Sequence, residues 1–284
     1  MVKNLQIRIA EVGISIEGDA EKSEWQTPQA YSPFIEPGKT DISLRLHRGI
    51  PDSLTGKKVF DSPPIWTLYR HDGTSIIKIF DKFAGLERTL VWSNNVEKAD
   101  LYFPEKPSRF YDPFYGPTME LLMVNYLAQG WGVIIHSCGI AWNEKGILFV
   151  GESGAGKSTL AEMWAEENGV EVLSDDRIIV RKKGDIFWMY GTPWHGDAPY
   201  SSPRGVSLEG IFFLKHGRKN SVKKLKGAEP ILSFLTCSFP PYWDPDGMAF
   251  ALDLFTDLAA HVPCHELAFR PDKTVIELVK EIAS

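Results

Sequence analysis

Cysteine is scarce in this sequence, and long apolar runs are absent. The three cysteines, Cys138, Cys237 and Cys264, are too few and too scattered for a disulfide framework, and no C-x-x-C pair offers a zinc site. No apolar run approaches the ~20 residues that a membrane-spanning helix requires. Residues 1–10 alternate charged and apolar side chains, so they lack the apolar segment of a secretion signal. We therefore expect a soluble protein of the reducing cytoplasm that has no membrane partner.

The sequence also lacks an excess of basic residues. Its 284 residues include 31 Lys and Arg against 37 Asp and Glu, which gives a formal net charge of −6 at pH 7. Nucleic acids and anionic membranes attract surfaces of positive charge, so we expect neither as a general partner. The concentrated basic stretch at residues 215–226 is typical of a solvated face, although a role in anion binding stays open. Any phosphate binding is therefore expected at a specific site.

The first part of the chain is predicted to be rich in β-strands. Up to about residue 105, short stretches of alternating apolar and polar residues are separated by Gly, Pro, Asp and Asn, which is typical of half-buried antiparallel strands. Between two of them, Asp72 and Gly73 supply the positive φ that a tight hairpin turn demands. The predicted strands are residues 5–9, 14–16, 42–46, 66–69, 75–80 and 89–92.

A proline-rich stretch separates this region from the remainder. Four prolines between residues 101 and 118 interrupt helices and strand ladders alike. We therefore predict two domains, a β-rich accessory region at residues 1–110 and a catalytic domain at residues 111–284. The accessory region could accept a peptide strand at an exposed sheet edge, or it could be purely structural.

The second part contains a phosphate-binding motif. Eight consecutive residues, 151–158, fit G-x-x-x-x-G-K-[ST] and continue through Thr159 into a helix, after an apolar strand at residues 146–150. In such a loop the backbone N–H groups surround the phosphates, Lys157 reaches the terminal ones and Ser158 holds Mg²⁺. The motif therefore predicts a site for ATP and Mg²⁺. Its residues are Gly151, Glu152, Ser153, Gly154, Ala155, Gly156, Lys157, Ser158 and Thr159.

Two adjacent carboxylates follow the loop helix. Asp175 and Asp176 end a short apolar strand at residues 170–173, as in the Walker B arrangement, in which a carboxylate helps to bind Mg²⁺. In a kinase, one of the two could bind the metal and the other could take the proton of the acceptor hydroxyl. The alternative is a solvated turn before the next strand, and the phosphate loop upstream favours the functional interpretation.

Three further residues are candidates for the site. His136 lies on a strand close in sequence to the loop strand, so it is either near the phosphates or a core histidine bonded to a backbone carbonyl. His195 and Arg204 lie in a loop dense in Gly, Pro and aromatic residues, and such loops often carry functional groups. Both are candidates for contacting the acceptor or the transferred phosphoryl group, with a solvated position as the alternative.

His136, the loop and the Asp175–Asp176 pair together resemble the catalytic core of HPr kinase/phosphorylase, where a His precedes a G-x-S-G-x-G-K-S loop and an Asp-Asp pair follows it. Residues 191–196, 210–214 and 243–244 are similar to HPr kinase-related proteins of peptide-maturation clusters, some of which phosphorylate a serine of a precursor peptide. The resemblance covers about residues 113–284 and implies an α/β fold, the P-loop domain of HPr kinase and phosphoenolpyruvate carboxykinase.

The resemblance also implies roles for individual residues. Lys157 would contact the β- and γ-phosphates and Ser158 the Mg²⁺. Asp175 and Asp176 would share the metal and the activation of an acceptor hydroxyl, with His136 near the transferred group. Three departures argue against HPr itself as the acceptor and against phosphorolysis: Thr159 replaces the usual acidic residue, the family's C-terminal signature is missing, and the N-terminal region is unrelated.

The leading hypothesis is an ATP-dependent kinase that phosphorylates a hydroxyl group, foremost the serine of a protein or peptide. A kinase for a small hydroxylated metabolite, or a carboxykinase-like enzyme, remains an alternative on the same core. A nucleotide-binding module without turnover is a third, which the intact Lys157, Ser158 and Asp pair disfavour. The sequence leaves the acceptor, the nucleotide preference and homo-oligomerisation open.

Overall fold

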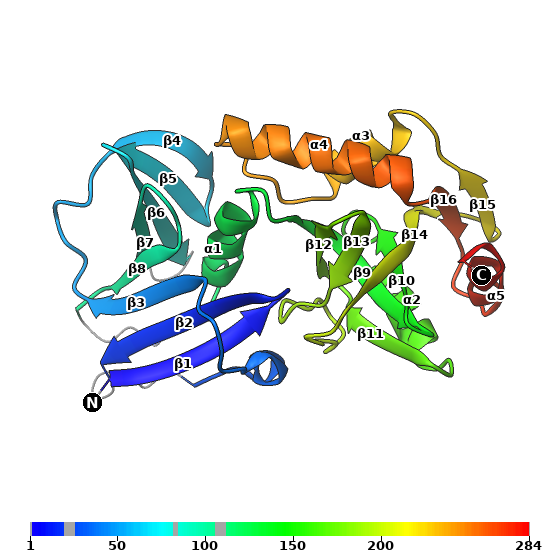
Figure 1. The fold of residues 1–284 in the computed structure, drawn as a ribbon, viewed down its shortest axis with the longest axis horizontal. Coiled ribbons are helices and arrows are strands. Elements are labelled where there is room, and N and C mark those ends of the chain that lie inside the picture. Colours follow the sequence, from blue (N-terminus) through cyan, green and yellow to red (C-terminus); the bar gives the residue numbers. More distant parts are fainter. Residues whose placement is uncertain (1, 20–25, 82–84, 106–111, 284) are drawn as a thin grey trace. The chain divides into compact units, whose positions relative to one another are not determined.

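The computed structural model describes residues 2–19, 26–81, 85–105 and 112–283 (Figure 1). The chain divides into two compact units, Met1–Tyr126 and Leu127–Ser284, in a mixed α/β fold with one eight-stranded sheet in each unit. The domain boundary predicted at residues 110/111 lies outside the described residues. Within the first unit, Arg88 is 1% exposed and donates hydrogen bonds to the carbonyl oxygens of Asp112 and Tyr115. These bonds tie the segment before helix α1 (Thr118–Leu127) to the first sheet.

The first sheet has the strand order β1-β2-β3-β8-β7-β6-β5-β4. Each strand predicted from alternation lies within a strand of the structure, and Asp72 and Gly73 have the positive φ of the predicted turn. The sheet is not wholly antiparallel as predicted, because β3 pairs in parallel with β2 and β8. The elements are β1 (Val2–Ile9), β2 (Val12–Asp19), the 3₁₀ helix η1 (Gln29–Phe34), β3 (Ile42–Arg48), β4 (Lys57–Ser62), β5 (Trp66–His71), β6 (Thr74–Asp81), β7 (Gly85–Ser93) and β8 (Lys98–Phe103).

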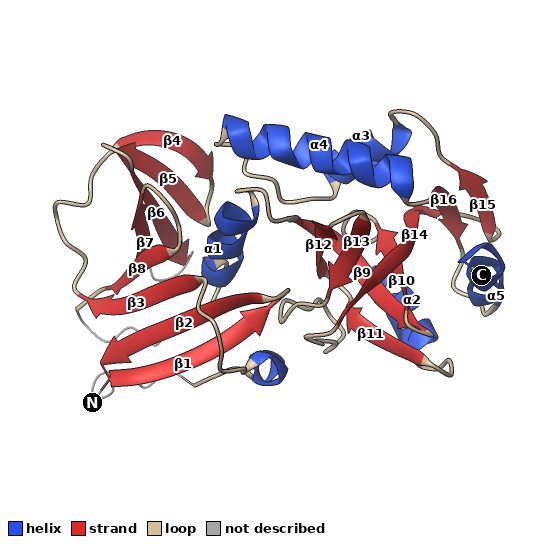
Figure 2. Ribbon diagram, viewed as in Figure 1, coloured by secondary structure: helices blue, strands red, loops and turns tan. Residues whose placement is uncertain are grey.

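Over its described residues, 127–283, the second unit contains the other sheet and helices α2 to α5 (Figure 2). Strands β10, β9, β12, β13 and β14 pair in that order, and β14 pairs back to β10, so the pairings form a closed ring. Strand β16 pairs with β14 and β15, while β11 pairs with β9. The strands are β9 (Val133–Trp142), β10 (Lys145–Val150), β11 (Val170–Ser174), β12 (Arg177–Lys183), β13 (Ile186–Tyr190), β14 (Gly205–His216), β15 (Ser221–Lys224) and β16 (Cys264–Phe269). The helices are α2 (Lys157–Ala165), α3 (Glu229–Thr236), α4 (Pro245–His261) and α5 (Thr274–Ala283).

Strand β10 is buried on both faces. Its side chains alternate between two apolar clusters, one that includes Leu148 and Val150 with residues of α3 and α4, and one that includes Ile147 and Phe149 with residues of α2 and α5. Burial of each such side chain contributes about 1.5–3 kcal/mol, so the strand is firmly held. Because β10 runs parallel to β14, and β14 to β16, the carboxyl ends of these strands lie at one edge of the sheet. The phosphate loop leaves the sheet at that edge.

Candidate functional site

The phosphate loop, residues 151–159, connects the end of β10 to the first turn of α2. Gly156 immediately precedes the helix with a φ of 95°, a left-handed conformation that glycine adopts without strain. A Cβ at this position would also lie 2.8 Å from Cε1 of Phe269. The backbone at the start of α2 is therefore packed against β16, and the free N–H groups of a helix N-terminus favour an anion.

Lys157 is held inside the site by three acceptors. Its ammonium group donates to the carbonyl oxygens of Gly151 at 2.8 Å and Glu152 at 3.0 Å, and it lies 2.9 Å from Nε2 of His136. These contacts use the three N–H donors of the ammonium group. The side chain is buried, and burial is the main reason that the pKa of Lys157 is lowered.

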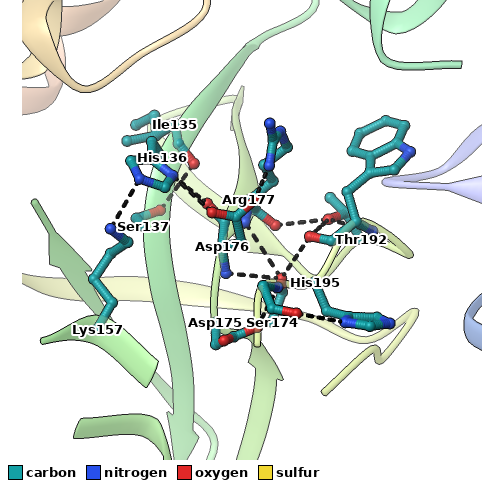
Figure 3. Close-up of polar contacts among 12 residues, drawn as sticks. Ile135, His136, Ser137, Lys157, Ser174, Asp175, Asp176, Arg177, Thr192 and His195 are labelled. Atoms are coloured by element: carbon teal, nitrogen blue, oxygen red, sulfur yellow. Dashed lines mark hydrogen bonds and ion pairs between the residues drawn. The ribbon is translucent and has the colours of Figure 1, made fainter. Parts of the chain in front are cut away.

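His136 connects Lys157 to Asp176. Its Nδ1 lies 3.0 Å from the Asp176 carbonyl oxygen and 2.9 Å from Asp176 Oδ1 (Figure 3). Burial, reinforced by the charges of Lys157 and Arg177, lowers the pKa of His136 to about 4. A neutral imidazole has one donor and one acceptor, so Nδ1–H donates to Asp176 and Nε2 accepts from Lys157. The structure thus combines the two interpretations of His136, since it bonds a backbone carbonyl and also lies in the site.

Asp175 lies beside the hydroxyl group of Ser158. The Ser158 Oγ donates to Asp175 Oδ2 at 2.7 Å, and the carboxylate also accepts from the backbone N–H groups of Gly196 at 2.8 Å and Ala198 at 3.2 Å. The Asp175 residue is only 1% exposed. A hydroxyl and a carboxylate oxygen next to a phosphate-binding loop are donors that suit Mg²⁺.

Few side chains in this site could act as ligands of a metal ion. Among the described residues, no group of three or more His, Cys, Asp and Glu side chains is arranged to hold a metal ion. Mg²⁺ commonly binds through one or two carboxylates and takes its other ligands from water and substrate phosphates. The Ser158–Asp175 pair therefore fits Mg²⁺ that arrives with a nucleotide.

Asp176 points away from Asp175. Its carboxylate contacts His136 and forms an ion pair with the guanidinium group of Arg177 (Figure 3). Arg177 was not among the residues singled out from the sequence. It pairs with His136 across strands β12 and β9, and its guanidinium carbon lies 4.9 Å from the ring centroid of Phe239. The sequence feature that could have pointed to Arg177 is its position directly after the Asp pair.

The segment from Cys237 to Phe239 completes the surroundings of His136. Its backbone accepts from His136 N at 2.7 Å and donates from Phe239 N to the Ile134 carbonyl oxygen at 2.9 Å. Strand β10 pairs with β9 only as far as Val150 and Ser137. Beyond Val150 the chain leaves the sheet to form the phosphate loop. The Cys237–Phe239 segment therefore takes the place next to β9 that β10 would occupy if it continued.

Two cavities meet at the phosphate loop, and together they include all of its nine predicted residues. The cavity of about 370 Å³, here the phosphate cavity, also contains His136, both aspartates, Gly196 and Asp197. The cavity of about 500 Å³, here the adjoining cavity, lies at the carboxyl ends of β10 and β14, and Ser153 lines both. Its lining is Val150, Gly151, Glu152, Ser153, Ala155, Phe213, Leu214, Lys215, His216, Ser233, Thr236 and Cys237.

His195 and Arg204 do not line either cavity. The His195 side chain is exposed, and its Nδ1 lies 3.0 Å from the Gly196 carbonyl oxygen. Arg204 forms ion pairs with Glu144 and Glu171, which hold it beside β11. The two residues that follow His195, Gly196 and Asp197, line the phosphate cavity instead.

Comparison with known proteins identifies the loop region. Residues 147–191 match the family model described as an AAA domain, so this segment is of the P-loop NTPase type. No curated protein matches the chain. The solved structure of the Hpr(Ser) kinase/phosphatase from Coxiella burnetii is similar at 14% identity and a TM-score of 0.31, over 52% of this chain and 92% of that chain. A TM-score at this level does not establish a shared fold. Among the described residues, no helix has both the length and the apolar character needed to cross a membrane.

Proposed function

We propose that this protein is an ATP-dependent kinase that transfers the γ-phosphoryl group of ATP to a hydroxyl group, the serine of a protein or peptide. The observation that carries the proposal is the divergence of the two aspartates. Asp175 Oδ2 accepts from Ser158 Oγ at 2.7 Å, whereas Asp176 Oδ1 lies 2.9 Å from His136 Nδ1, and both residues line the phosphate cavity. Metal binding and proton transfer would thus belong to different carboxylates.

The two cavities suit the two ends of a nucleotide. The phosphate cavity would take the phosphates against the loop N–H groups and Lys157, and the adjoining cavity would take the nucleoside, because the two meet at Ser153. Ser158 and Asp175 would hold Mg²⁺, which neutralises phosphate charge when bound.

Asp176 would act as the general base. It would accept the proton of the acceptor hydroxyl while the hydroxyl oxygen forms a bond to the γ-phosphorus. The bond from the γ-phosphorus to the oxygen that bridges the β- and γ-phosphates would break, and ADP would leave. Neutral His136 would hold Asp176 and Lys157 in place, and Lys157 would stabilise the charge that develops on the leaving phosphate.

A serine acceptor is supported by the resemblance of the His136, loop and Asp pair pattern to serine kinases of HPr type. The side chains of His195 and Asp197 are exposed at and beside the phosphate cavity, so a polypeptide can reach it from solvent. The metabolite kinase hypothesis is an outcome of the same experiment rather than a separate proposal.

The test is phosphoryl transfer from [γ-³²P]ATP with Mg²⁺ to a library of serine peptides and to a panel of hydroxylated metabolites. We expect transfer to peptides, its loss in Lys157→Ala, and strong suppression in Asp176→Asn with ATP binding retained. Binding is measured separately by calorimetry. Transfer only to metabolites would favour the alternative acceptor class, and ATP binding without any transfer would favour a nucleotide-binding module. Normal turnover by Lys157→Ala would refute the kinase proposal.

A further inference from the structure

The loop between β13 and β14, residues 191–204, lies along the strand that carries the Asp pair. Its backbone is bonded to β11, since Ser202 N donates to the Leu173 carbonyl oxygen at 3.0 Å and Ser174 pairs with Ser201 in an isolated β-bridge. This loop, here the β13–β14 loop, therefore pairs with β11 much as a further strand would.

The far end of the β13–β14 loop is anchored by charge. Arg204 Nη1 donates to Glu171 Oε2 at 2.8 Å, and its other terminal nitrogen pairs with Glu144. Ser202 Oγ donates to Glu171 Oε1 at 2.6 Å. The residue that was a candidate for an acceptor contact thus holds the loop against β11.

Two buried hydroxyl groups join the β13–β14 loop to the turn at the Asp pair. Ser174 Oγ donates to the Trp194 carbonyl oxygen at 3.2 Å and accepts from the N–H groups of Asp176 and Arg177, each at 3.3 Å (Figure 3). Thr192, which is 0% exposed, donates from Oγ1 to the Arg177 carbonyl oxygen at 2.7 Å. The backbone on either side of the aspartates is therefore fixed from the loop.

The loop also holds the Asp175 carboxylate itself. Gly196 N donates to Oδ1 at 2.8 Å and Ala198 N to Oδ2 at 3.2 Å, on the same carboxylate that accepts from Ser158. A Cβ at Gly196 would lie 2.9 Å from Asp175 Oδ2 and 3.4 Å from the Asp176 Cβ. Only glycine lets the loop approach both aspartates this closely.

From these contacts we infer that Thr192 and Gly196 are positioning residues, through which the β13–β14 loop orients the Asp175 carboxylate and so sets the affinity of the phosphate site for Mg²⁺ with its nucleotide. The inference rests on the proposed function, because it assigns Asp175 to the metal. Groups that orient a ligand of a metal ion commonly change its affinity by about 10–100-fold when they are removed. Thr192 lines neither cavity, and Gly196, which lines the phosphate cavity, is assigned its role through the backbone N–H that it donates to Asp175.

The test measures nucleotide binding, not turnover. Calorimetric titrations with a non-hydrolysable ATP analogue, at graded Mg²⁺ and in EDTA, are compared for wild type, Thr192→Val and Gly196→Ala. We expect both variants to need about tenfold more Mg²⁺ for half-maximal enhancement of binding, while their affinity in EDTA stays within about twofold of wild type. Thr192→Ser keeps the hydroxyl group and should retain the Mg²⁺ dependence of wild type.

Matched controls separate position from chemistry. Thr256→Val removes an exposed threonine hydroxyl on α4, and Gly210→Ala adds a Cβ with an ordinary 3.6 Å contact to Phe212, so both should behave as wild type. Circular dichroism checks that each variant is folded, and if Thr192→Val is not, Gly196→Ala in the exposed part of the loop carries the test. Wild-type Mg²⁺ dependence in a folded positioning variant would overturn the inference while leaving the kinase proposal intact. Absence of Mg²⁺-dependent nucleotide binding in wild type would overturn the kinase proposal and this inference together.

Discussion

His136 should make the stability of the protein depend on pH in a defined window. Its pKa is lowered to about 4, first by burial and then by the neighbouring charges of Lys157 and Arg177. In the unfolded chain a histidine titrates near ~6.5. As the pH falls below that value the unfolded state binds a proton that the folded state does not, so the free energy of unfolding decreases until the pH passes about 4.

The magnitude follows from the two pKa values. Between pH 7 and pH 5, proton linkage with pKa values of about 4 and ~6.5 gives a loss of about 2 kcal/mol, out of about 3 kcal/mol for the whole window. His136→Gln removes the titrating group while keeping one donor and one acceptor in the side chain. The variant should therefore lose about 2 kcal/mol less than wild type over the same change of pH, because the remaining titrating groups are common to both proteins.

The assay is urea unfolding at pH 7 and pH 5, followed by circular dichroism. His216→Gln is the matched control, because His216 is an exposed histidine of the same unit and its replacement should leave the loss as it is in wild type. If wild type and His136→Gln lose the same free energy of unfolding between the two pH values, then His136 is not held neutral by its surroundings. The assignment of Nε2 as the acceptor for Lys157 would fail with it.

Three other substitutions probe separate parts of the structure. Ser158→Ala removes the hydroxyl group that donates to Asp175 and should weaken Mg²⁺-dependent ATP binding by about tenfold. Calorimetry in EDTA should show unchanged binding, and equal weakening with Mg²⁺ and with EDTA would contradict a role of Ser158 in binding the metal. Arg88→Met removes a buried guanidinium group that donates to the carbonyl oxygens of Asp112 and Tyr115, and should lower the free energy of unfolding by about 3 kcal/mol. Arg45→Met, which breaks an exposed ion pair, should cost less than about 1 kcal/mol, and similar urea curves for the two variants would contradict this. Trp164→Ala opens a cavity under α2 and should lower the free energy of unfolding by about 3–5 kcal/mol, measured by thermal or urea unfolding. A loss below about 1 kcal/mol would contradict the burial of Trp164 between α2 and the sheet.

The local parts of the fold could be predicted from the sequence. The alternation of apolar and polar residues predicted six strands of the first sheet, because the apolar side chains of each strand share a buried face. The continuous apolar run before the phosphate loop predicted β10, which is buried on both faces. Strand β4 was missed because its side chains are mostly exposed and show no alternation. The parallel pairings of β3 were missed because long connections, not tight turns, bring the chain back to β2 and β8.

The candidate site divides in the same way. The loop and the Asp pair are contiguous in the sequence, so their residue types and spacing carry the information, and the structure brings them together with His136 in one cavity. The part played by Cys237–Phe239 could not be predicted, because it depends on a pairing with β9 across about a hundred residues of chain. Arg204 was selected because it is a charged residue in a loop rich in Gly, Pro and aromatic residues. The structure instead pairs it with Glu144 and Glu171, which its local sequence does not indicate.

The Cys237–Phe239 segment connects the lining of the adjoining cavity to the surroundings of His136. Cys237 lines the adjoining cavity directly after α3, and two residues later the ring of Phe239 contacts both His136 and Arg177. The backbone of this segment is hydrogen-bonded to β9 at both of its ends, through Cys237 O and Phe239 N. If a nucleotide fills both cavities as proposed, a shift of α3 at the adjoining cavity would reach the ring beside His136 through only three residues of backbone.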